Sequence, residues 1–127
     1  MKIGDELPEI KMPITLHRLV MEAGANRDLS MIHHDTKVAH ATGAPEAYAN
    51  TFFLMGMFER QLREYVGLEG RIKKIGPMAM KTFNCVGDVL NFKGKITAID
   101  DDLISVDQWV ESERGITTTC RSVLSLK

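Results

Sequence analysis

The hydrophobic positions of this chain follow a helical period in its first half and an alternating period in its second half. A short amphipathic helix is predicted to begin after Thr15, a good capping residue, and to end at Gly24. Its apolar positions recur at i, i+3, i+4 and i+7: Leu16, Leu19, Val20 and Ala23. A second short helix is predicted over Thr36–Thr42, between Asp35 as its cap and Gly43 as its stop.

The longest helix is predicted over Asn50–Val66 and ends before Gly67. Its second half is amphipathic, with Leu62 and Tyr65 set against charged residues. Its first half is apolar on almost every side: Phe52, Phe53, Leu54, Met55, Met57 and Phe58. Such a helix must be surrounded by other elements over its first half and reach the surface at its carboxyl end.

In the second half of the chain the hydrophobic period is two residues, which is typical of strands with one buried face. Three strands are predicted, over residues 90–98, 103–110 and 116–126, separated by turns at Asp100–Asp102 and Glu113–Gly115. The apolar face of the first strand consists of Leu90, Phe92, Gly94, Ile96 and Ala98. The short turns between these strands indicate an antiparallel meander.

One further strand is predicted over residues 71–83, with a bend near Gly76–Pro77 because proline lacks the N–H that a strand ladder needs. A long apolar helix and a meander of long strands have one economical arrangement, in which a curved antiparallel sheet wraps around the helix. We therefore expect an α+β hotdog fold that forms one domain over residues 1–127. The open edges of such a sheet favour a dimer with a continuous sheet.

The composition is that of an ordinary soluble globular protein, with 127 residues of which 44% are hydrophobic and 26% are charged. The 16 basic and 17 acidic side chains give a formal net charge of −1. No strong field therefore attracts the chain to phosphates, and neither nucleic acid nor a membrane is expected as a partner. The most apolar run, Tyr48–Phe58, is too short to span a bilayer. The amino terminus lacks the apolar run of a secretory signal, which favours a cytoplasmic location.

The densest group of titratable residues outside the periodic elements spans residues 27–35 and contains Asp28 and His33. Loops often carry the catalytic groups of enzymes. Taken alone, this spacing fits equally a helix-capping aspartate and a surface histidine. The position of the segment, between an amphipathic helix and a short helix and ahead of a buried helix, favours a functional role.

The other histidines and the two cysteines indicate no metal or redox chemistry. A metal site could be sought in His33, His34, Asp35 and His40. These residues lack HExxH spacing, and adjacent ligands rarely converge on one ion, so no metal is expected. His17 is expected on the surface of its helix. Cys85 and Cys120 lack CxxC spacing and fall in strand-like segments, which is typical of buried, reduced cysteines.

The polar segment resembles the MaoC-like, or hydratase-2, family of hotdog enzymes. The family pattern is Asp-x-Asn-Pro-(Ile/Leu)-His-x-Asp followed by x-x-x-Ala-x-x-x-Gly. The positions that match it in register are Asp28, Ile32, His33, Asp35, Ala39 and Gly43. Downstream, the run from Phe83 to Gly87-Asp88-Val89-Leu90 is similar to the segment that leads into a strand of the family. The resemblance covers about Thr15 to Ala98.

The chain departs from the general pattern at two places. Ser30 and Met31 replace the usual Asn-Pro, and the helix entry, which often carries a His-Gly pair, reads Ala49-Asn50-Thr51. Arg27-Asp28, the doubled His33-His34-Asp35 and the asparagine at the helix entry resemble a narrower branch, the small subunits of actinobacterial steroid side-chain enoyl-CoA hydratases. The resemblance implies that Asp28 and His33 are the catalytic pair and that a homodimer, or a heteromer with a larger MaoC-like subunit, is formed.

Hydration of a trans-2-enoyl thioester requires a deprotonated water, a proton for the α-carbon and a site for negative charge on the thioester oxygen. Asp28 and His33 can share the first two tasks by holding one water between them. The amides of Thr51 or Phe52, at the amino-terminal end of the long helix, are candidate donors for the third task. Asn50 marks this end, and capping alone explains that residue equally well.

The substrate expected from this resemblance is an acyl-CoA, with water as co-substrate and no metal or organic cofactor. Arg71, Lys73 and Lys74 form a basic cluster that can meet the phosphates of coenzyme A, although a solvated strand edge explains them as well. A hotdog thioesterase is one alternative, with Glu59 as its available acid. A non-catalytic acyl-CoA-binding subunit of a hydratase complex is the other.

Overall fold

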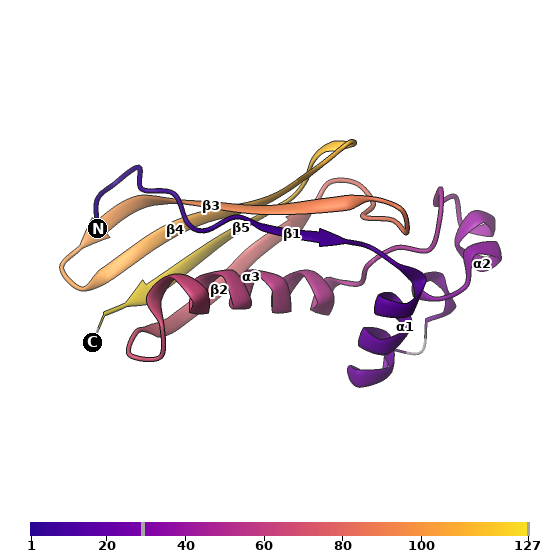
Figure 1. Cartoon of the computed structure of the whole chain (residues 1–127), viewed down its shortest axis with the longest axis horizontal. Helices are drawn as coiled ribbons and strands as arrows, with labels where there is room; N and C mark the ends of the chain where they lie inside the picture. Colours follow the sequence, from indigo (N-terminus) through magenta and orange to yellow (C-terminus); the bar gives the residue numbers. More distant parts are fainter. Residues whose placement is uncertain (29, 127) are drawn as a thin grey trace.

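A five-stranded antiparallel sheet curves over one long helix in the computed structural model, which describes residues 1–28 and 30–126 (Figure 1). The strand order is β1-β3-β4-β5-β2. The strands are β1 (Ile10–Pro13), β2 (Arg71–Met80), β3 (Val89–Asp100), β4 (Leu103–Ser112) and β5 (Gly115–Ser125). The long helix, α3 (Thr51–Val66), lies under the sheet, whereas α1 (Leu16–Ala25) and α2 (Thr36–Ala41) lie beyond its amino-terminal end. This arrangement confirms the hotdog fold.

The meander of β3, β4 and β5 is confirmed, and its buried faces follow the alternation of the sequence. Ala98 is an exception, because the register shifts between Ile96 and Ala98 and leaves Ala98 exposed. The bend in β2 is also confirmed by a register shift between Ile75 and Met78, which flank Gly76–Pro77. The strand ends at Met80 and not at residue 83.

Two short elements escaped the sequence prediction because neither is long enough to show a period. β1 pairs with β3, where Ile10 lies opposite Phe92, and it forms one edge of the sheet. A 3-10 helix, η1 (Met31–His33), shapes the polar segment before α2. β2 forms the other edge of the sheet.

The three α-helices begin where their capping residues predict. The Thr15 hydroxyl accepts the N–H of Arg18 at 3.2 Å, and the Asp35 carboxylate accepts the N–H of Lys37 at 2.9 Å. Gly67, at φ 69°, follows the last residue of α3. Gly24 does not end α1, because the helix continues to Ala25.

α3 is buried on one side and open on the other, which corrects the expectation that its first half is surrounded. Its buried residues are Phe53, Leu54, Met57, Phe58, Gln61 and Leu62. Phe52 is 57% exposed, and Gly56 is exposed as well. A single sheet covers only the side of the helix that faces it, so the open side is available for other contacts.

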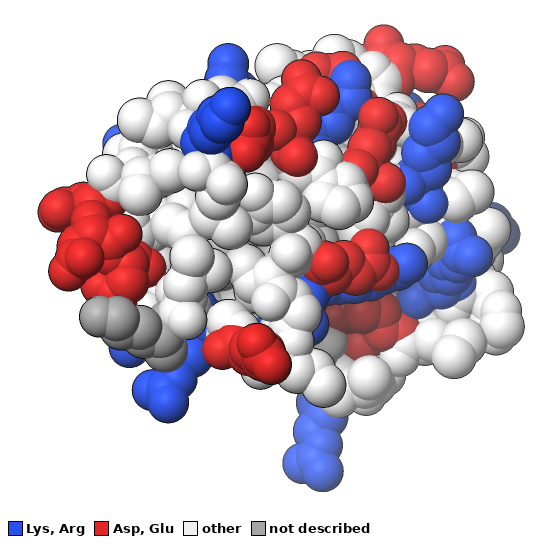
Figure 2. Space-filling model, turned by 60° about the vertical axis from the view of Figure 1, so that its left-hand side comes forward, with Lys and Arg blue, Asp and Glu red and all other residues white. Residues whose placement is uncertain are grey.

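The surface agrees with the small net charge of the sequence. In Figure 2 acidic and basic side chains are interspersed on the visible face, with uncharged areas between them. None of the helices in the described part of the chain has the length and hydropathy that crossing a membrane requires. Cys85 and Cys120 are buried, as expected, and burial raises the pKa of both thiols.

A buried polar network joins α3 to the middle of the sheet. Gln108 donates its amide to the Phe58 carbonyl and to Gln61 Oε1, each at 3.0 Å, and accepts the Ser122 hydroxyl at 2.7 Å. Gln61 in turn donates to the carbonyl of Phe92 at 2.9 Å. These side chains are at most 2% exposed. Each one therefore depends on its partners, since a buried polar group without a hydrogen bond is costly.

Replacing Gln108 with Leu is expected to lower the free energy of unfolding by about 2 kcal/mol, because Gln61 Oε1 and the Ser122 hydroxyl lose their partner. The double substitution Gln61→Leu/Gln108→Leu is expected to cost less than the sum of the two single changes, since it removes both members of the pair. Urea unfolding of the four proteins measures both effects. Strictly additive losses would show that the two amides do not stabilise each other.

Candidate active site

Asp28 and His33 meet beside the amino-terminal end of α3. Asp28 follows α1 and His33 ends η1, and His33 Nε2 lies 3.5 Å from Asp28 Oδ2. The two side chains are 23% and 11% exposed, so the pair is sheltered but still reaches solvent. Leu29, between them in the sequence, lies outside the described residues.

The orientation of His33 is set by the backbone of the segment that leads into α3. Its Nδ1 lies 2.8 Å from the carbonyl oxygen of Tyr48. A carbonyl only accepts, so Nδ1 must carry the proton and donate it. The N–H of Tyr48 also donates to the Ile32 carbonyl at 3.4 Å, and the Tyr48 ring packs edge-on against the imidazole with centroids 5.1 Å apart. In the neutral imidazole Nε2 therefore presents its lone pair toward Asp28.

The carboxylate of Asp28 is held by two donors. The N–H of Ser30 donates to Oδ1 at 3.1 Å, and the amide of Asn50 donates to Oδ2 at 3.1 Å. The N–H of Ser30, then Asn50 and the nearby His33 and His34 lower the pKa of Asp28 against a smaller opposing effect of burial. The side chain is therefore an acceptor at neutral pH.

In the form that has a neutral imidazole, His33 and the ionised Asp28 present two acceptors to each other, and 3.5 Å is a long separation for a direct hydrogen bond. One water molecule can donate one hydrogen to each of them. A water held in this way has two neighbouring groups that can accept its proton.

The amino-terminal end of α3 lies next to this pair because Asn50 bonds both to the helix end and to Asp28. Asn50 Oδ1 accepts the N–H of Phe53 at 2.8 Å, which caps the helix, and Nδ2 donates to Asp28. Within residues 1–28 and 30–126, the N–H groups of Thr51 and Phe52 have no partner. These two donors and the positive end of the helix dipole are available for a developing negative charge.

A groove of about 530 Å³ runs along the open side of α3 from this end. Its floor includes Phe52 and Gly56, its walls include Glu22 and Ile75, and it extends to Glu59. The sequence analysis did not single out Glu22, because a carboxylate on an amphipathic helix gives no sign of the side it faces. Burial raises the pKa of Glu22, and Asn50 and Asn26 oppose that effect.

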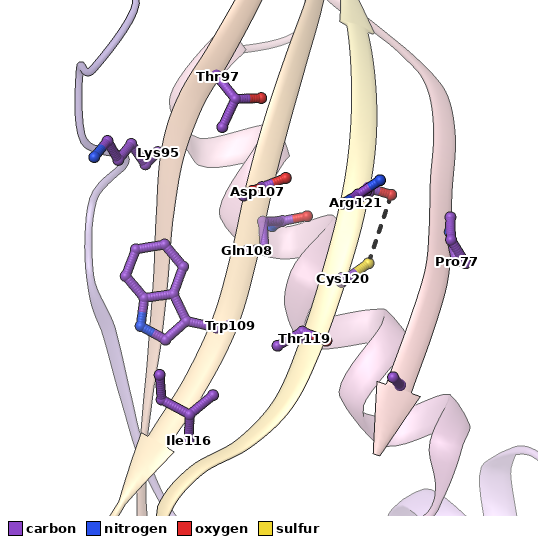
Figure 3. A pocket seen from close by; sticks show the side chains of 11 residues that line it. Pro77, Lys95, Thr97, Asp107, Gln108, Trp109, Ile116, Thr119, Cys120 and Arg121 are labelled. Atoms are coloured by element: carbon purple, nitrogen blue, oxygen red, sulfur yellow. Dashed lines mark hydrogen bonds between the residues drawn. The ribbon is translucent and has the colours of Figure 1, made fainter. Parts of the chain in front are cut away.

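A second hollow, of about 610 Å³, lies on the outer face of the sheet, with α3 behind the strands (Figure 3). Lys95, Trp109 and Arg121 line it. Asp28 and His33 line neither of these two hollows. The groove along α3 contains Phe52, one of the predicted oxyanion donors, and is therefore the better candidate for a substrate.

The structure does not bring the predicted basic cluster to the Asp28–His33 pair. Arg71, Lys73 and Lys74 are exposed at the start of β2, after the carboxyl end of α3. The pair lies at the opposite end of this 16-residue helix, which is about 24 Å long. A contact of the cluster with coenzyme A stays a prediction.

The other titratable residues considered in the sequence analysis lie outside the Asp28–His33 pair. His17 is exposed, as predicted, and Asp35 caps α2. His40 contacts Glu46, with 3.7 Å between Nε2 and Oε1. In the part of the chain that the structure describes, no three His, Cys, Asp or Glu side chains are grouped as metal ligands would be. Glu59 is exposed at the far end of the groove.

Comparison with known proteins identifies relatives of the whole chain, although no protein-family model matches it. The chain is 30% identical, over 98% of its length and 96% of the relative, to the 3-oxo-4,17-pregnadiene-20-carboxyl-CoA hydratase beta subunit of Mycobacterium tuberculosis. Its fold matches a chain of the ChsH1–ChsH2 complex of that organism, with a TM-score of 0.94, 29% identity and coverage of 99% and 98% of the two chains. The (R)-hydratase of A. caviae shares the fold at a TM-score of 0.90 and 16% identity, with coverage of 100% and 98%.

The depressed pKa of Asp28 predicts how stability responds to acid. A carboxylate whose pKa is lower in the folded state stabilises that state above its unfolded pKa, near 3.9, and this contribution is lost as the pH falls through the folded value. Wild type is therefore expected to lose stability relative to Asp28→Asn as the pH falls below about 4. Urea unfolding of both proteins between pH 6 and pH 3, chosen as a rough range around that value, measures the difference. A difference that stays constant across this range would contradict the assigned contacts.

Proposed function

This chain belongs to the MaoC-like family of hotdog hydratases, and we propose that it adds water to a trans-2-enoyl-CoA thioester as the catalytic small subunit of a hydratase. The convergence of Asp28 and His33, with His33 Nε2 facing the carboxylate, is the observation that carries this proposal. The pair holds a water and accepts one of its protons as the oxygen attacks the β-carbon. A proton returned by the pair to the α-carbon completes the addition.

Negative charge develops on the thioester oxygen during the attack. The N–H groups of Thr51 and Phe52 receive this charge, supported by the dipole of α3. They lie on the residues that directly follow Asn50, which also binds Asp28. The amino-terminal end of α3 thus positions Asp28, which binds the water, and supplies the amides that bind the thioester oxygen. The reaction uses no metal or organic cofactor in this proposal, and coenzyme A enters as part of the substrate.

The acyl group occupies the groove along the open side of α3. The groove begins near the reacting pair and presents Phe52, Phe53 and Met57 to its occupant. A bulky apolar acyl group suits this lining, because burial of apolar surface drives its binding. The substrate named for the relative, a pregnadiene carboxyl-CoA, belongs to this class and supports a steroid-derived acyl chain here as well.

A larger MaoC-like subunit is the partner that the observations favour, with a homodimer as the alternative. The mycobacterial structure that the chain matches is a complex of two different proteins, ChsH1 and ChsH2. In the described chain β2 is an edge strand, and Phe52 is exposed on the open side of α3. An unpaired edge next to exposed apolar surface favours association.

Asp28→Asn and His33→Ala are each expected to lower kcat at least about a hundredfold, since each removes one of the two groups that hold the water. The assay follows the loss of conjugated enoyl absorbance with short-chain, long-chain and steroid enoyl-CoA, with and without a larger homologous subunit. His17→Ala is the matched control, because His17 is exposed on α1 outside the pair.

Three outcomes would contradict the proposal. Near-normal turnover in either variant would remove that residue from the mechanism. Release of free thiol from acyl-CoA, abolished by Glu59→Gln, would establish a thioesterase. Tight binding of enoyl-CoA without turnover, even with the larger subunit, would establish a non-catalytic binding subunit.

The partner proposal predicts that Phe52→Glu weakens assembly, because it places a charge on the exposed apolar side of α3. Leu68→Glu is the control, since Leu68 is 92% exposed beyond the carboxyl end of α3. Light scattering after size exclusion, with the larger subunit and without it, measures the mass of each species. Equal assembly of the two variants would place the interface elsewhere.

A further inference from the structure

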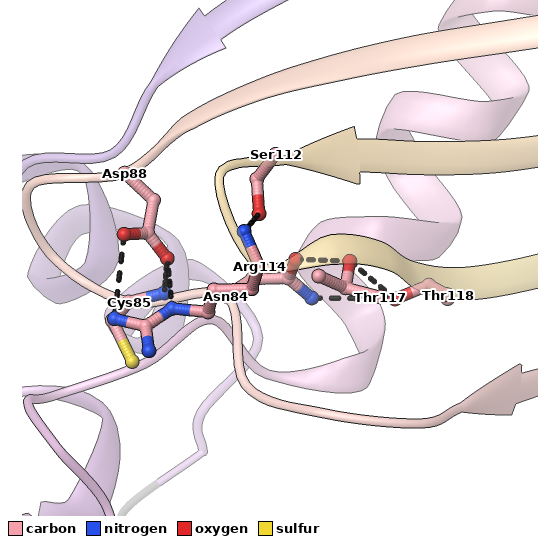
Figure 4. A network of polar contacts seen from close by, with 7 residues as sticks. All are labelled: Asn84, Cys85, Asp88, Ser112, Arg114, Thr117 and Thr118. Atoms are coloured by element: carbon pink, nitrogen blue, oxygen red, sulfur yellow. Dashed lines mark hydrogen bonds and ion pairs between the residues drawn. The ribbon is translucent and has the colours of Figure 1, made fainter.

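Residues 84–88 form a loop before β3 that is fastened to the sheet by polar side chains (Figure 4). Asp88 Oδ2 accepts the Nε–H of Arg114 at 2.8 Å and the N–H of Cys85 at 3.0 Å. Asp88 Oδ1 lies 3.4 Å from Nη2 of the same guanidinium. The N–H of Asp88 also donates to the Cys85 carbonyl at 3.0 Å, so the loop is closed on itself as well as on Arg114.

Arg114, the partner of Asp88, is itself fixed by a hydrogen bond of its backbone. Arg114 lies in the turn between β4 and β5, where its N–H donates to the Ser112 hydroxyl at 3.1 Å. Next to it in β5, the Thr117 hydroxyl donates to Asn84 Oδ1. Asn84 Nδ2 also donates to the Thr118 hydroxyl at 3.3 Å, so the side chains of Asp88 and Asn84 both hold the loop against one β-hairpin. The Asp88 side chain is 11% exposed and that of Arg114 is 33% exposed, so water screens their ion pair only in part.

The same loop holds the segment that orients His33. The N–H of Val86 donates to the Ala47 carbonyl at 2.9 Å, and the N–H of Ala49 donates to the Asn84 carbonyl at 2.8 Å. These two bonds flank Tyr48, which lies opposite Cys85 in an antiparallel bridge. The carbonyl of Tyr48 is the acceptor for Nδ1 of His33 at 2.8 Å.

We propose that Asp88 and Arg114 are positioning residues, which fix the tautomer and orientation of His33 through the carbonyl of Tyr48. The inference rests on the proposed function, in which Nε2 of His33 must present a lone pair. Neither residue touches the Asp28–His33 pair. Their ion pair anchors the 84–88 loop to the β4–β5 turn. Backbone hydrogen bonds from this loop fix Ala47 and Ala49, on either side of Tyr48, and the Tyr48 carbonyl binds the ring of His33. A small displacement of that carbonyl weakens the bond that assigns the proton to Nδ1, and catalysis is sensitive to shifts of this size.

Arg114→Gln is the principal test, and Lys93→Gln is its matched control. Lys93 and Glu111 form a second ion pair, with 3.0 Å between Nζ and Oε2, which joins β3 to β4. In the described chain this second pair has no bond to residues 47–49 or 84–88. Each of the two substitutions thus removes one partly exposed positive charge from an ion pair, and only Arg114 is connected to His33.

Arg114→Gln is expected to lower kcat about tenfold or more with a smaller change in KM, whereas Lys93→Gln keeps kcat within about twofold of wild type. Arg114→Lys restores part of the loss, because a lysine keeps one charged donor for Asp88. Nitrogen-15 NMR of the histidine rings is expected to show Nδ1–H as the dominant tautomer of His33 in wild type and a mixture of tautomers in Arg114→Gln. Urea unfolding shows whether the variants differ in stability.

A normal kcat in Arg114→Gln, or a loss no larger than that of Lys93→Gln at equal stability, would overturn the positioning role. An unchanged His33 tautomer would overturn it as well. Failure of the proposed function is distinct from both results, since the wild-type protein with its larger subunit would then hydrate no enoyl-CoA. The tautomer measurement would still test the link between Arg114 and His33, because it requires no turnover.

Discussion

The side-chain amide of Asn50 is the contact on which both the long helix and the candidate site depend. Its oxygen caps α3 through the N–H of Phe53, and its nitrogen donates to Asp28. A carboxylate at this position would keep the cap but has no donor to offer Asp28. The helix that supplies the core therefore also fixes one of the two groups proposed to hold the water.

The division of α3 into a buried side and an open side gives this helix two tasks. Its buried side forms the core with the sheet and includes the hydrogen-bonded pair Gln61 and Gln108. Its open side forms the groove that includes Phe52, at the amino-terminal end of the helix. One sheet provides enough surface to cover only one side, so the uncovered side remains for an acyl group and a partner subunit under the proposed function.

Rigidity at the candidate site comes from backbone contacts made at a distance from it. The carbonyl of Tyr48 assigns the proton of His33 to Nδ1, and the bonds on either side of Tyr48 lead to a loop held by Asp88 and Arg114. A histidine held only by its own loop would rotate more freely. The sheet thus contributes to the site although, among the described residues, Asp28 and His33 form their side-chain hydrogen bonds and ion pair with residues outside the strands.

α3, the strands of the meander and the helix caps could be predicted from the sequence alone, because these features depend on neighbours within about four residues. The sequence also located the segment of Asp28 and His33, through its family resemblance. Three features became visible only in the folded chain: the short strand β1, the exposure of Ala98 after a register shift, and the position of Glu22 in the lining of the groove. The bonds that orient the site join residues 15 and 22 positions apart, His33 to Tyr48 and Asp28 to Asn50. No local period encodes such contacts, because they form only when the chain has folded around α3.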